Sequence, residues 1–315
     1  MNELLHAGID LGGTNVKIVL VTADGIVHAR EIVPTRASDP PHTTVERVAS
    51  AIRRLTGGRR LAGAGLGCAG ALDLEAGVVV ESPNLPAWNG APARRLFAEL
   101  LGVPVEFDND ANCAALGEHW LGAGRGASSL VALTLGTGIG GGIVLGGRVW
   151  RGATGTAGEI GHVTIAPDTG PICGCGSRGC VETLASATAI VREVARRLAA
   201  GERSMLAGRE PTAREAAEAA RAGDALARSV FDEAGRHLGI ALALLANLLN
   251  PERAVLCGGL AGAWDILEAA ARAALRRHAF ARPAGTLDIR TGELGEFSGA
   301  LGAARMTVLG GSGTT

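Results

Sequence analysis

The most specific pattern in the sequence is a histidine followed by three closely spaced cysteines, His162, Cys173, Cys175 and Cys180. One imidazole and three thiolates complete a tetrahedral zinc site, and the glycines between the cysteines let a short loop wrap around the ion. The alternative is a set of unpaired, partly buried thiols. Because four protein ligands leave no open coordination position, the pattern predicts a structural Zn²⁺ that does not activate water.

A second group of polar side chains lies between a predicted strand and a predicted helix, in the order Asp108, Asn109, Asp110 and Asn112. Asp and Asn are good helix N-caps, and this alternative accounts for one of the four residues. Ligands also bind at the carboxyl ends of strands in open α/β sheets. There, Asp110 could accept the proton of a substrate hydroxyl, as the base of a kinase does. We therefore predict that Asp110 is catalytic.

Two glutamates flank the predicted zinc loop, Glu159 before His162 and Glu182 just after Cys180. Exposed surface glutamates are the alternative. Carboxylates that accept hydrogen bonds from hydroxyl groups are common sugar ligands, however, and a position beside a metal-braced loop favours contact with a sugar substrate.

Asp10 ends a predicted strand beside Gly12, Gly13 and Thr14. It could be a turn residue that bonds its own backbone. A carboxylate beside phosphate-binding glycines also suits Mg²⁺, usually through water, and we favour this role.

Two glycine-rich segments, residues 8–20 and 133–145, share the order strand, Gly-Thr turn, strand and tight turn. Gly136, Gly138 and Gly141 match the G-x-G-x-x-G pattern of dinucleotide-binding loops, but such a loop must lead into a helix. Both segments continue instead into β-branched residues that favour strands. We interpret them as hairpins whose backbone N–H groups approach phosphate oxygens, and their similarity indicates a duplicated architecture.

Elsewhere, predicted strands alternate with predicted helices, which indicates α/β layers with helices packed on sheets. A capping box at Thr212 and Glu215 begins one helix, and another runs from Asp224 to about residue 249. The other predicted elements are strands 61–68, 103–107 and 253–257 and helices 43–55, 91–101, 111–120, 185–200 and 264–277.

Composition and charge exclude several classes of protein. The 315 residues are 47% hydrophobic and carry a formal net charge of −1, with no strongly basic stretch, so no nucleic-acid partner is expected. The beginning of the chain lacks a signal-peptide pattern, and the longest apolar stretch, residues 238–249, is too short to span a bilayer. With a cluster of reduced thiols, these features predict a cytoplasmic protein without a membrane partner.

The motifs occur in an order that resembles the ROK family (repressors, open reading frames, kinases) of the actin/hexokinase/Hsp70 superfamily, and within it the bacterial glucokinases. The matching segments are residues 10–15, 108–111, 135–142 and 158–162 and the three cysteines. The resemblance extends over nearly the whole chain. It implies a duplicated ribonuclease H-like (actin-like ATPase) fold with two α/β domains around a central cleft. Residues 1–112 plus 298–315 would form the small domain and residues 113–297 the large one.

The resemblance also implies roles for single residues. Asp110 would take the proton from the 6-hydroxyl of D-glucose, while one ring nitrogen of His162 ligates zinc and the other donates to a sugar hydroxyl. The residues that match sugar-binding positions are Asn84, Asn109, Glu159, His162 and Glu182. Those that match the ATP-binding loops are Gly12, Gly13, Thr14, Thr137, Gly138, Gly258 and Gly259, with Asp10 beside Mg²⁺.

Two alternatives stay open. The sugar could be N-acetylglucosamine, N-acetylmannosamine, mannose or allose, or the protein could be a sugar-sensing regulator without catalysis. The intact Asp110 and the early start of the first glycine loop, which leaves no room for the helix-turn-helix of the repressor branch, argue against a regulator. The cysteine cluster favours ATP over polyphosphate as donor, and the resemblance implies a homo-oligomer, a dimer or a tetramer.

Overall fold

The computed structural model describes residues 4–310, and the chain divides into two compact units. The first unit comprises Met1–Ser128, Gly142–Gly158 and Glu293–Thr315, and the second comprises Ser129–Gly141 and Glu159–Gly292. The chain therefore passes between the units several times. This division places residues 113–128 in the first unit. The family resemblance implies domain boundaries at residues 112 and 298, and these stay a prediction.

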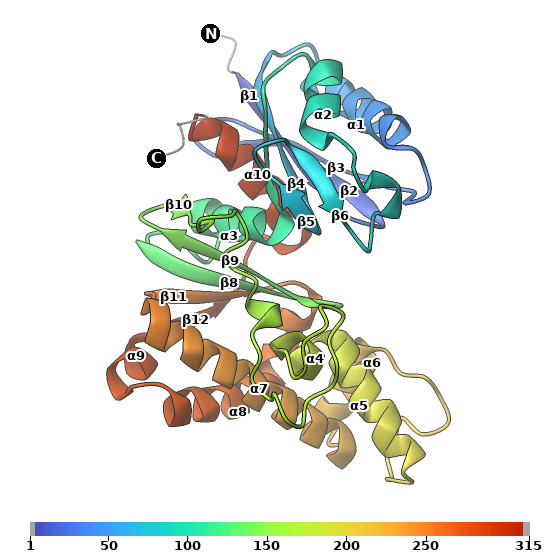
Figure 1. Cartoon of the computed structure of the whole chain (residues 1–315), viewed down its shortest axis with the longest axis vertical. Coiled ribbons are helices and arrows are strands. Elements are labelled where there is room, and N and C mark those ends of the chain that lie inside the picture. The colour runs from blue at the N-terminus through green and yellow to red at the C-terminus, as the bar shows by residue number, and fades with distance from the viewer. Residues whose placement is uncertain (1–3, 311–315) are drawn as a thin grey trace. The chain divides into compact units, whose positions relative to one another are not determined.

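The first unit is built on a five-stranded sheet with the strand order β3-β2-β1-β4-β7 (Figure 1). The strands are β1 (Leu5–Leu11), β2 (Asn15–Val21), β3 (Val27–Pro34), β4 (Leu61–Cys68) and β7 (Val105–Asn109). β1, β2 and β3 are antiparallel neighbours, whereas β4 runs parallel to β1 and β7 parallel to β4. In this register Leu11, Cys68 and Asn109 are side by side. The carboxyl ends of the three parallel strands thus meet at one edge of the sheet.

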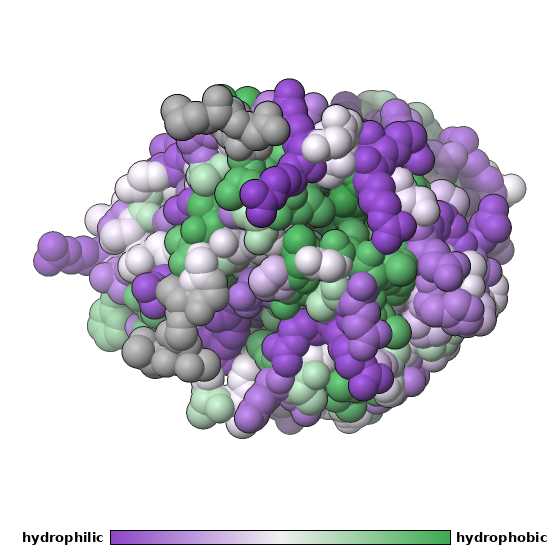
Figure 2. All heavy atoms as spheres, turned by 90° about the horizontal axis from the view of Figure 1, so that it is seen from above, coloured by the Kyte–Doolittle hydropathy of each residue, from purple (hydrophilic) through white to green (hydrophobic). Residues whose placement is uncertain are grey.

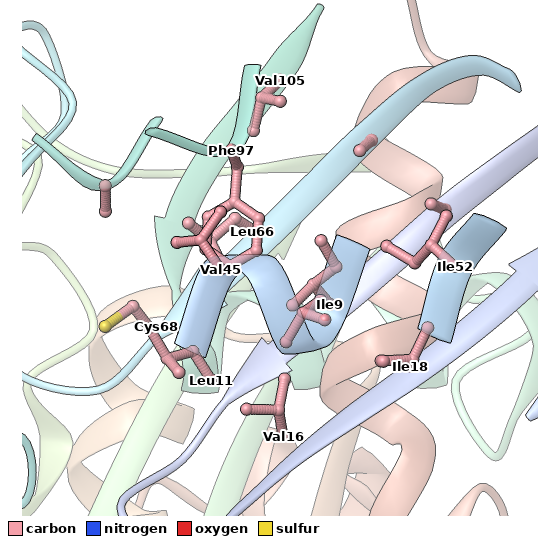
Figure 3. Close-up of a cluster of buried hydrophobic side chains, with 14 of the residues drawn as sticks. Ile9, Leu11, Val16, Ile18, Val45, Ile52, Leu66, Cys68, Phe97 and Val105 are labelled. Atoms are coloured by element: carbon pink, nitrogen blue, oxygen red, sulfur yellow. The ribbon is translucent and has the colours of Figure 1, made fainter. Parts of the chain in front are cut away.

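Helices cover both faces of this sheet. On one face, α1 (Pro41–Thr56) and α2 (Ala93–Leu101) bury Val45, Ile52 and Phe97 in a core with Ile9 and Leu66 (Figure 3). On the other face, α3 (Asp110–Leu121) and α10 (Ser298–Val308) pack against each other, and α10 crosses β1 and β4. The remaining elements of this unit are β5 (Ala71–Asp73), β6 (Val78–Glu81), η1 (Pro86–Trp88) and η4 (Gly295–Phe297).

A second five-stranded sheet has the order β10-β9-β8-β11-β12 (Figure 1). Its strands are β8 (Ser129–Leu135), β9 (Ile139–Leu145), β10 (Arg148–Val149), β11 (Arg253–Cys257) and β12 (Asp288–Thr291). β8, β11 and β12 run parallel, and β9 crosses the boundary between the units. As predicted, both glycine-rich turns lead into strands, β2 and β9, and not into helices.

The helices of the second unit follow the start and stop signals in the sequence. Thr212 and Glu215 form a capping box at the beginning of α6, and Asp224 caps the long helix α7, which ends at Asn250 in the left-handed conformation. The helix predicted at 185–200 is confirmed as α5, which Ser186 caps, and a separate short helix, α4, precedes it. The elements are η2 (Ile160–His162), α4 (Val181–Ala185), α5 (Ala187–Ala199), α6 (Ala213–Arg221), α7 (Ala225–Leu249), η3 (Gly259–Ala263), α8 (Trp264–His278) and α9 (Ala281–Thr286).

On the face seen in Figure 2, hydrophilic side chains surround and separate smaller hydrophobic areas. Among residues 4–310, no helix combines the length and the hydropathy that crossing a bilayer requires.

Candidate active site

Asp110 is the first residue of α3 and is partly buried where β7 ends. Asn109 caps this helix, since its Oδ1 accepts hydrogen bonds from the N–H groups of Ala111 at 2.8 Å and Asn112 at 3.4 Å. The Oδ1 atom of Asp110 accepts a second bond from Ala111, at 2.9 Å. Asn109 therefore provides the cap, and Oδ2 of Asp110 makes no hydrogen bond within the described part of the chain.

Asp10 and Lys17 form an ion pair close to Asp110 in the first unit. The two residues are opposite each other in the antiparallel register of β1 and β2, and Oδ2 of Asp10 lies 3.2 Å from Nζ of Lys17. Burial raises the pKa of Asp10, and the charge of Lys17 opposes that shift. Burial and, second, the charge of Asp10 raise the pKa of Asp110 to about 6. A carboxylate with this pKa is ionised at neutral pH and is basic enough to accept a hydroxyl proton.

Asp108, at the end of β7, is completely buried and has hydrogen-bond partners on both oxygens. Oδ1 accepts from the backbone N–H of Asn109 at 2.7 Å and from Nδ2 of Asn112 at 2.9 Å. Oδ2 accepts from Nε and Nη2 of Arg151, both at 2.7 Å. A buried carboxylate needs such partners, because an unpaired buried charge is strongly destabilising.

The first glycine turn lies against the predicted sugar residue Asn84. The N–H of Gly12 donates to the carbonyl of Asn15 at 3.2 Å, and the carbonyl of Thr14 accepts from Thr35 at 2.9 Å. A Cβ atom added to Gly13 would lie 2.6 Å from the backbone oxygen of Asn84, so a larger residue would force the two segments apart. The structure thus brings a predicted phosphate loop and a predicted sugar ligand together.

The second glycine turn belongs to the second unit and is held by α4 and α5. The N–H of Ile139 donates to Oε2 of Glu182 at 3.0 Å. The carbonyls of Gly136 and Thr137 accept from the N–H of Ala187 at 2.9 Å and the hydroxyl of Thr188 at 2.8 Å. These bonds use the carbonyls of the turn, which leaves the N–H groups of Thr137 and Gly138 available to an anionic ligand.

The four predicted metal ligands are together in the second unit, and their ligand atoms all lie within 4.8 Å of one another. Nδ1 of His162 is 3.6 Å from Sγ of Cys173, and Sγ of Cys175 is 3.7 Å from Sγ of Cys180. Zn–S and Zn–N bonds of about 2.3 and 2.0 Å in a tetrahedron separate two sulfurs by about 3.8 Å and a sulfur from a nitrogen by about 3.5 Å. The cysteines are unpaired, and the donor set fits zinc in both chemistry and spacing.

Glu159 and His162 lie at the two ends of the short helix η2. Both side chains are exposed, and the N–H of His162 donates to the carbonyl of Glu159 at 3.1 Å. A Cβ atom on Gly161 would lie 1.9 Å from the carbonyl oxygen of Ile139, so this segment packs directly on the beginning of β9. Because Nδ1 of His162 faces the cysteines, Nε2 is the ring nitrogen left for another partner.

Gly258 and Gly259 follow β11. Cys257 is paired with Thr134 of β8, so Gly258 lies beside the end of β8, where the second glycine turn begins. Gly258 has a φ of 84°, a conformation that favours glycine, and Gly259 begins η3.

The predicted site residues thus form two groups, one within each unit. The first unit holds Asp10, Gly12, Gly13, Thr14, Asn84, Asn109 and Asp110. The second holds Thr137, Gly138, Glu159, His162, Glu182, Gly258, Gly259 and the three clustered cysteines.

Sequence reasoning missed Lys17 and Arg151. Lys17 could have been found from the hairpin alone, because alternate residues of paired antiparallel strands face each other across the ladder. Arg151 could not, because it is 43 residues from Asp108 and no local pattern connects them.

Comparison with known proteins places these features in a family context. The model of the ROK family matches residues 6–308. The glucokinase of Halalkalibacterium halodurans is 38% identical over 312 residues, which is 96% of this chain and 94% of that protein.

Two solved structures are similar over almost the full length. The ROK hexokinase of Thermus thermophilus has a TM-score of 0.84 and 38% identity, with 97% of this chain and 98% of the other covered. A ROK family glucokinase from Streptomyces griseus, in complex with glucose and AMPPNP, has a TM-score of 0.79 and 33% identity, with 96% and 98% covered.

Proposed function

The chain belongs to the ROK family, and on that basis we propose that it is an ATP-dependent glucokinase, which converts D-glucose to glucose 6-phosphate. The two-sheet α/β fold predicted from the sequence agrees with the actin-like ATPase fold of ROK sugar kinases. The observation that carries the proposal is the state of Asp110. Its Oδ2 accepts no hydrogen bond from residues 4–310, and its pKa is raised to about 6.

Asp110 is the proposed general base. Its carboxylate takes the proton of the 6-hydroxyl while that oxygen forms a bond to the γ-phosphorus and the bond from phosphorus to the β,γ-bridging oxygen breaks, releasing ADP. Phosphoryl transfer depends mainly on positioning and charge stabilisation, so one base and aligned donors suffice. The cap provided by Asn109 fixes the start of α3 and with it the backbone that carries Asp110.

The sugar ligands that we propose are Asn84, Asn109, Glu159, His162 and Glu182. Carboxylate and amide oxygens accept hydrogen bonds from sugar hydroxyls, and Nε2–H of His162 donates one. The contact of Gly13 with Asn84 supports a sugar position beside the first phosphate loop.

ATP is the proposed donor, held by Gly12, Gly13, Thr14, Thr137, Gly138, Gly258 and Gly259. The backbone N–H groups of such turns bind phosphate oxygens. The carboxylate of Asp10 is the proposed magnesium partner, because its Oδ1 is not used by Lys17 and hard oxygen ligands suit this ion. Magnesium supplies charge neutralisation of the phosphates when it is bound.

A structural zinc ion is the proposed occupant of the cluster at His162, Cys173, Cys175 and Cys180. Its four protein ligands would leave no open coordination position for water or substrate, so the ion would be structural. Ligation through Nδ1 would fix the tautomer of His162 that keeps a proton on Nε2, so the metal would prepare this side chain for the sugar.

An assay of ADP release over a panel of hexoses tests the proposal. We expect turnover with glucose and ATP, and a loss of about 10²–10⁴-fold in kcat for Asp110→Asn with glucose binding retained. Faster turnover with N-acetylglucosamine, N-acetylmannosamine, mannose or allose would show that this sugar, and not glucose, is the substrate. Absence of turnover with every sugar would contradict a kinase and favour the alternative, a sugar-sensing regulator without catalysis.

The cytoplasmic location, the homo-oligomeric state and the lack of a nucleic-acid partner stay predictions. The cysteines of the cluster form no disulfide, which supports the predicted cytoplasmic location. In a reducing compartment, clustered cysteines are typically metal ligands.

A further inference from the structure

Arg151 connects two segments of the first unit that are far apart in the sequence. Its guanidinium binds the carboxylate of Asp108 with two N–H groups, while its carbonyl accepts a hydrogen bond from the N–H of Ala157 at 3.0 Å. One residue therefore holds both the end of β7 and the segment 151–157, which leads into Glu159. The guanidinium is partly exposed, whereas its partner carboxylate has no exposure at all.

The other oxygen of Asp108 organises the turn that carries Asp110. It accepts from the backbone N–H of Asn109 and from the side-chain amide of Asn112, the residues on either side of the Asp110–Ala111 pair. Asn112 is 2% exposed and its Oδ1 has no partner within residues 4–310, so its amide is oriented by Asp108 alone. An oxygen acceptor at position 108 is thus required for this geometry, and the carboxylate that supplies it needs a cation to balance its charge.

The charges around Asp110 are of both signs and come from several elements. Uncompensated, the charge of Asp108 would add to that of Asp10, which already disfavours the ionised form of Asp110. Among the described residues, the charges that act on Asp110 are those of Asp10 of β1 and Lys17 of β2, and the charge of Asp110 in turn acts on Cys68 of β4. Cys113 of α3 is reached by the charges of Asp108, Asp110 and Arg151, so the pair of Asp108 and Arg151 lies in the same neighbourhood as the base.

From these contacts we propose that Arg151 is a positioning residue for phosphoryl transfer: it neutralises Asp108, and so fixes the turn of the catalytic base and keeps that base ionised. The inference rests on the proposed function. Arg151 does not itself contact the reacting atoms in this scheme, and its effect passes through Asp108.

The test compares Arg151→Met, Arg151→Lys, Asp108→Asn and the double variant Asp108→Asn/Arg151→Met, with Arg148→Met as control. Arg148 is an exposed residue of the neighbouring strand β10 and has no ion pair in the described part of the chain. The main measurement is kcat/KM for glucose as a function of pH. A purely structural role would lower stability or the amount of active enzyme without moving the acid limb of this profile.

We expect Arg151→Met to move the midpoint of the acid limb upward by about 1 pH unit, since an unbalanced carboxylate near a base raises its pKa. Activity should then fall about five-fold at pH 6 and hardly at all at pH 8. The double variant should return the midpoint towards that of the wild type, Arg151→Lys should lie between them, and the control should match the wild type. An unchanged midpoint in Arg151→Met would overturn the proposal.

Urea unfolding provides a second test that needs no activity. It compares the wild type, Asp108→Asn, Arg151→Met and the double variant. Coupling between positions 108 and 151 makes the double variant less unstable than the sum of the single changes predicts. Additive changes would refute the pairing, even if the wild type phosphorylates no sugar. Failure of the wild type with every hexose, together with clear coupling, would refute the proposed function and leave the charge pairing established.

Discussion

Glu182 accepts a hydrogen bond from the backbone N–H of Ile139 at 3.0 Å, and its other carboxylate oxygen lies 3.9 Å from the sulfur of Cys173. One side chain therefore contacts both the second glycine turn and the cysteine cluster. Both contacts lie within the second unit. The proposed sugar ligand Glu182 is thus also a physical connection between the metal loop and the loop that would hold phosphate.

This connection predicts different results for two substitutions of Glu182. Glu182→Ala removes the acceptor of the Ile139 N–H, and a lost hydrogen bond to a charged group corresponds to about 1.5–3 kcal/mol. We expect KM to rise roughly ten-fold or more for both glucose and ATP. Glu182→Gln keeps an acceptor for Ile139, so KM should rise for glucose with little change for ATP. Steady-state kinetics with each substrate varied separately provide the measurement. A normal KM for ATP in Glu182→Ala would refute the connection.

The raised pKa of Asp110 predicts the pH dependence of catalysis. The base must be ionised, so kcat/KM should be constant at neutral pH and fall ten-fold per pH unit well below about 6. A profile that is flat down to pH 4.5 would show that Asp110 does not titrate as the base.

The same shift predicts a pH-dependent effect on stability. The pKa of Asp110 is higher in the folded chain, about 6, than its ordinary value of 3.8. Its contribution to stability is therefore fully present below pH 3.8 and is lost as pH rises through 6. Relative to the wild type, Asp110→Asn should therefore gain about 1.4 kcal/mol in free energy of unfolding between pH 5 and pH 8, which is the upper part of a full effect of about 3 kcal/mol. Urea unfolding of both proteins at pH 5 and pH 8 checks this. A stability difference between the variant and the wild type that becomes smaller as the pH rises would contradict it.

Metal removal should affect both stability and sugar binding. We expect one Zn²⁺ per chain by elemental analysis, and a lower Tm together with a higher KM for glucose in Cys175→Ala, because metal binding stabilises the fold that it requires. A chelator should lower the Tm of the wild type and leave that of the variant nearly unchanged. Metal-free protein with normal melting and normal KM would exclude a zinc-braced sugar site.

The parts of the molecule that local patterns determine were predictable. The two glycine hairpins follow from β-branched residues and turn signals that lie within one segment. The cluster of His162 with the cysteines follows from ligand types and spacing.

What local patterns do not determine is which distant segments pack together. The pairing of Asp108 with Arg151 joins residues on different elements, and neither residue type is unusual for an exposed site. Nor does the sequence around Gly8 and Gly65 show that α10 will cross the sheet at these glycines, because strand glycines more often indicate bulges or bends.

The crossing of α10 over the first sheet gives the last prediction. Gly8 and Gly65 are neighbours in the parallel register of β1 and β4, and a Cβ atom at either would lie 1.8 Å from a carbonyl oxygen of α10, that of Ala300 or Ala303. Gly65→Ala must therefore push the helix away from the sheet, at a loss of about 3 kcal/mol of stability or more.

Activity should decrease with that displacement, because Gly299 of the same helix lies against Asp10, whose carboxylate carbon would be 3.1 Å from a Cβ atom at that position. Gly285→Ala is the matched control: it lies in α9 with open space around its Cβ direction, and it should be neutral or stabilise by about 0.5–1 kcal/mol. Thermal and urea unfolding of the two variants measure the difference. A Gly65→Ala protein as stable as the control would mean that α10 does not rest on these two strands.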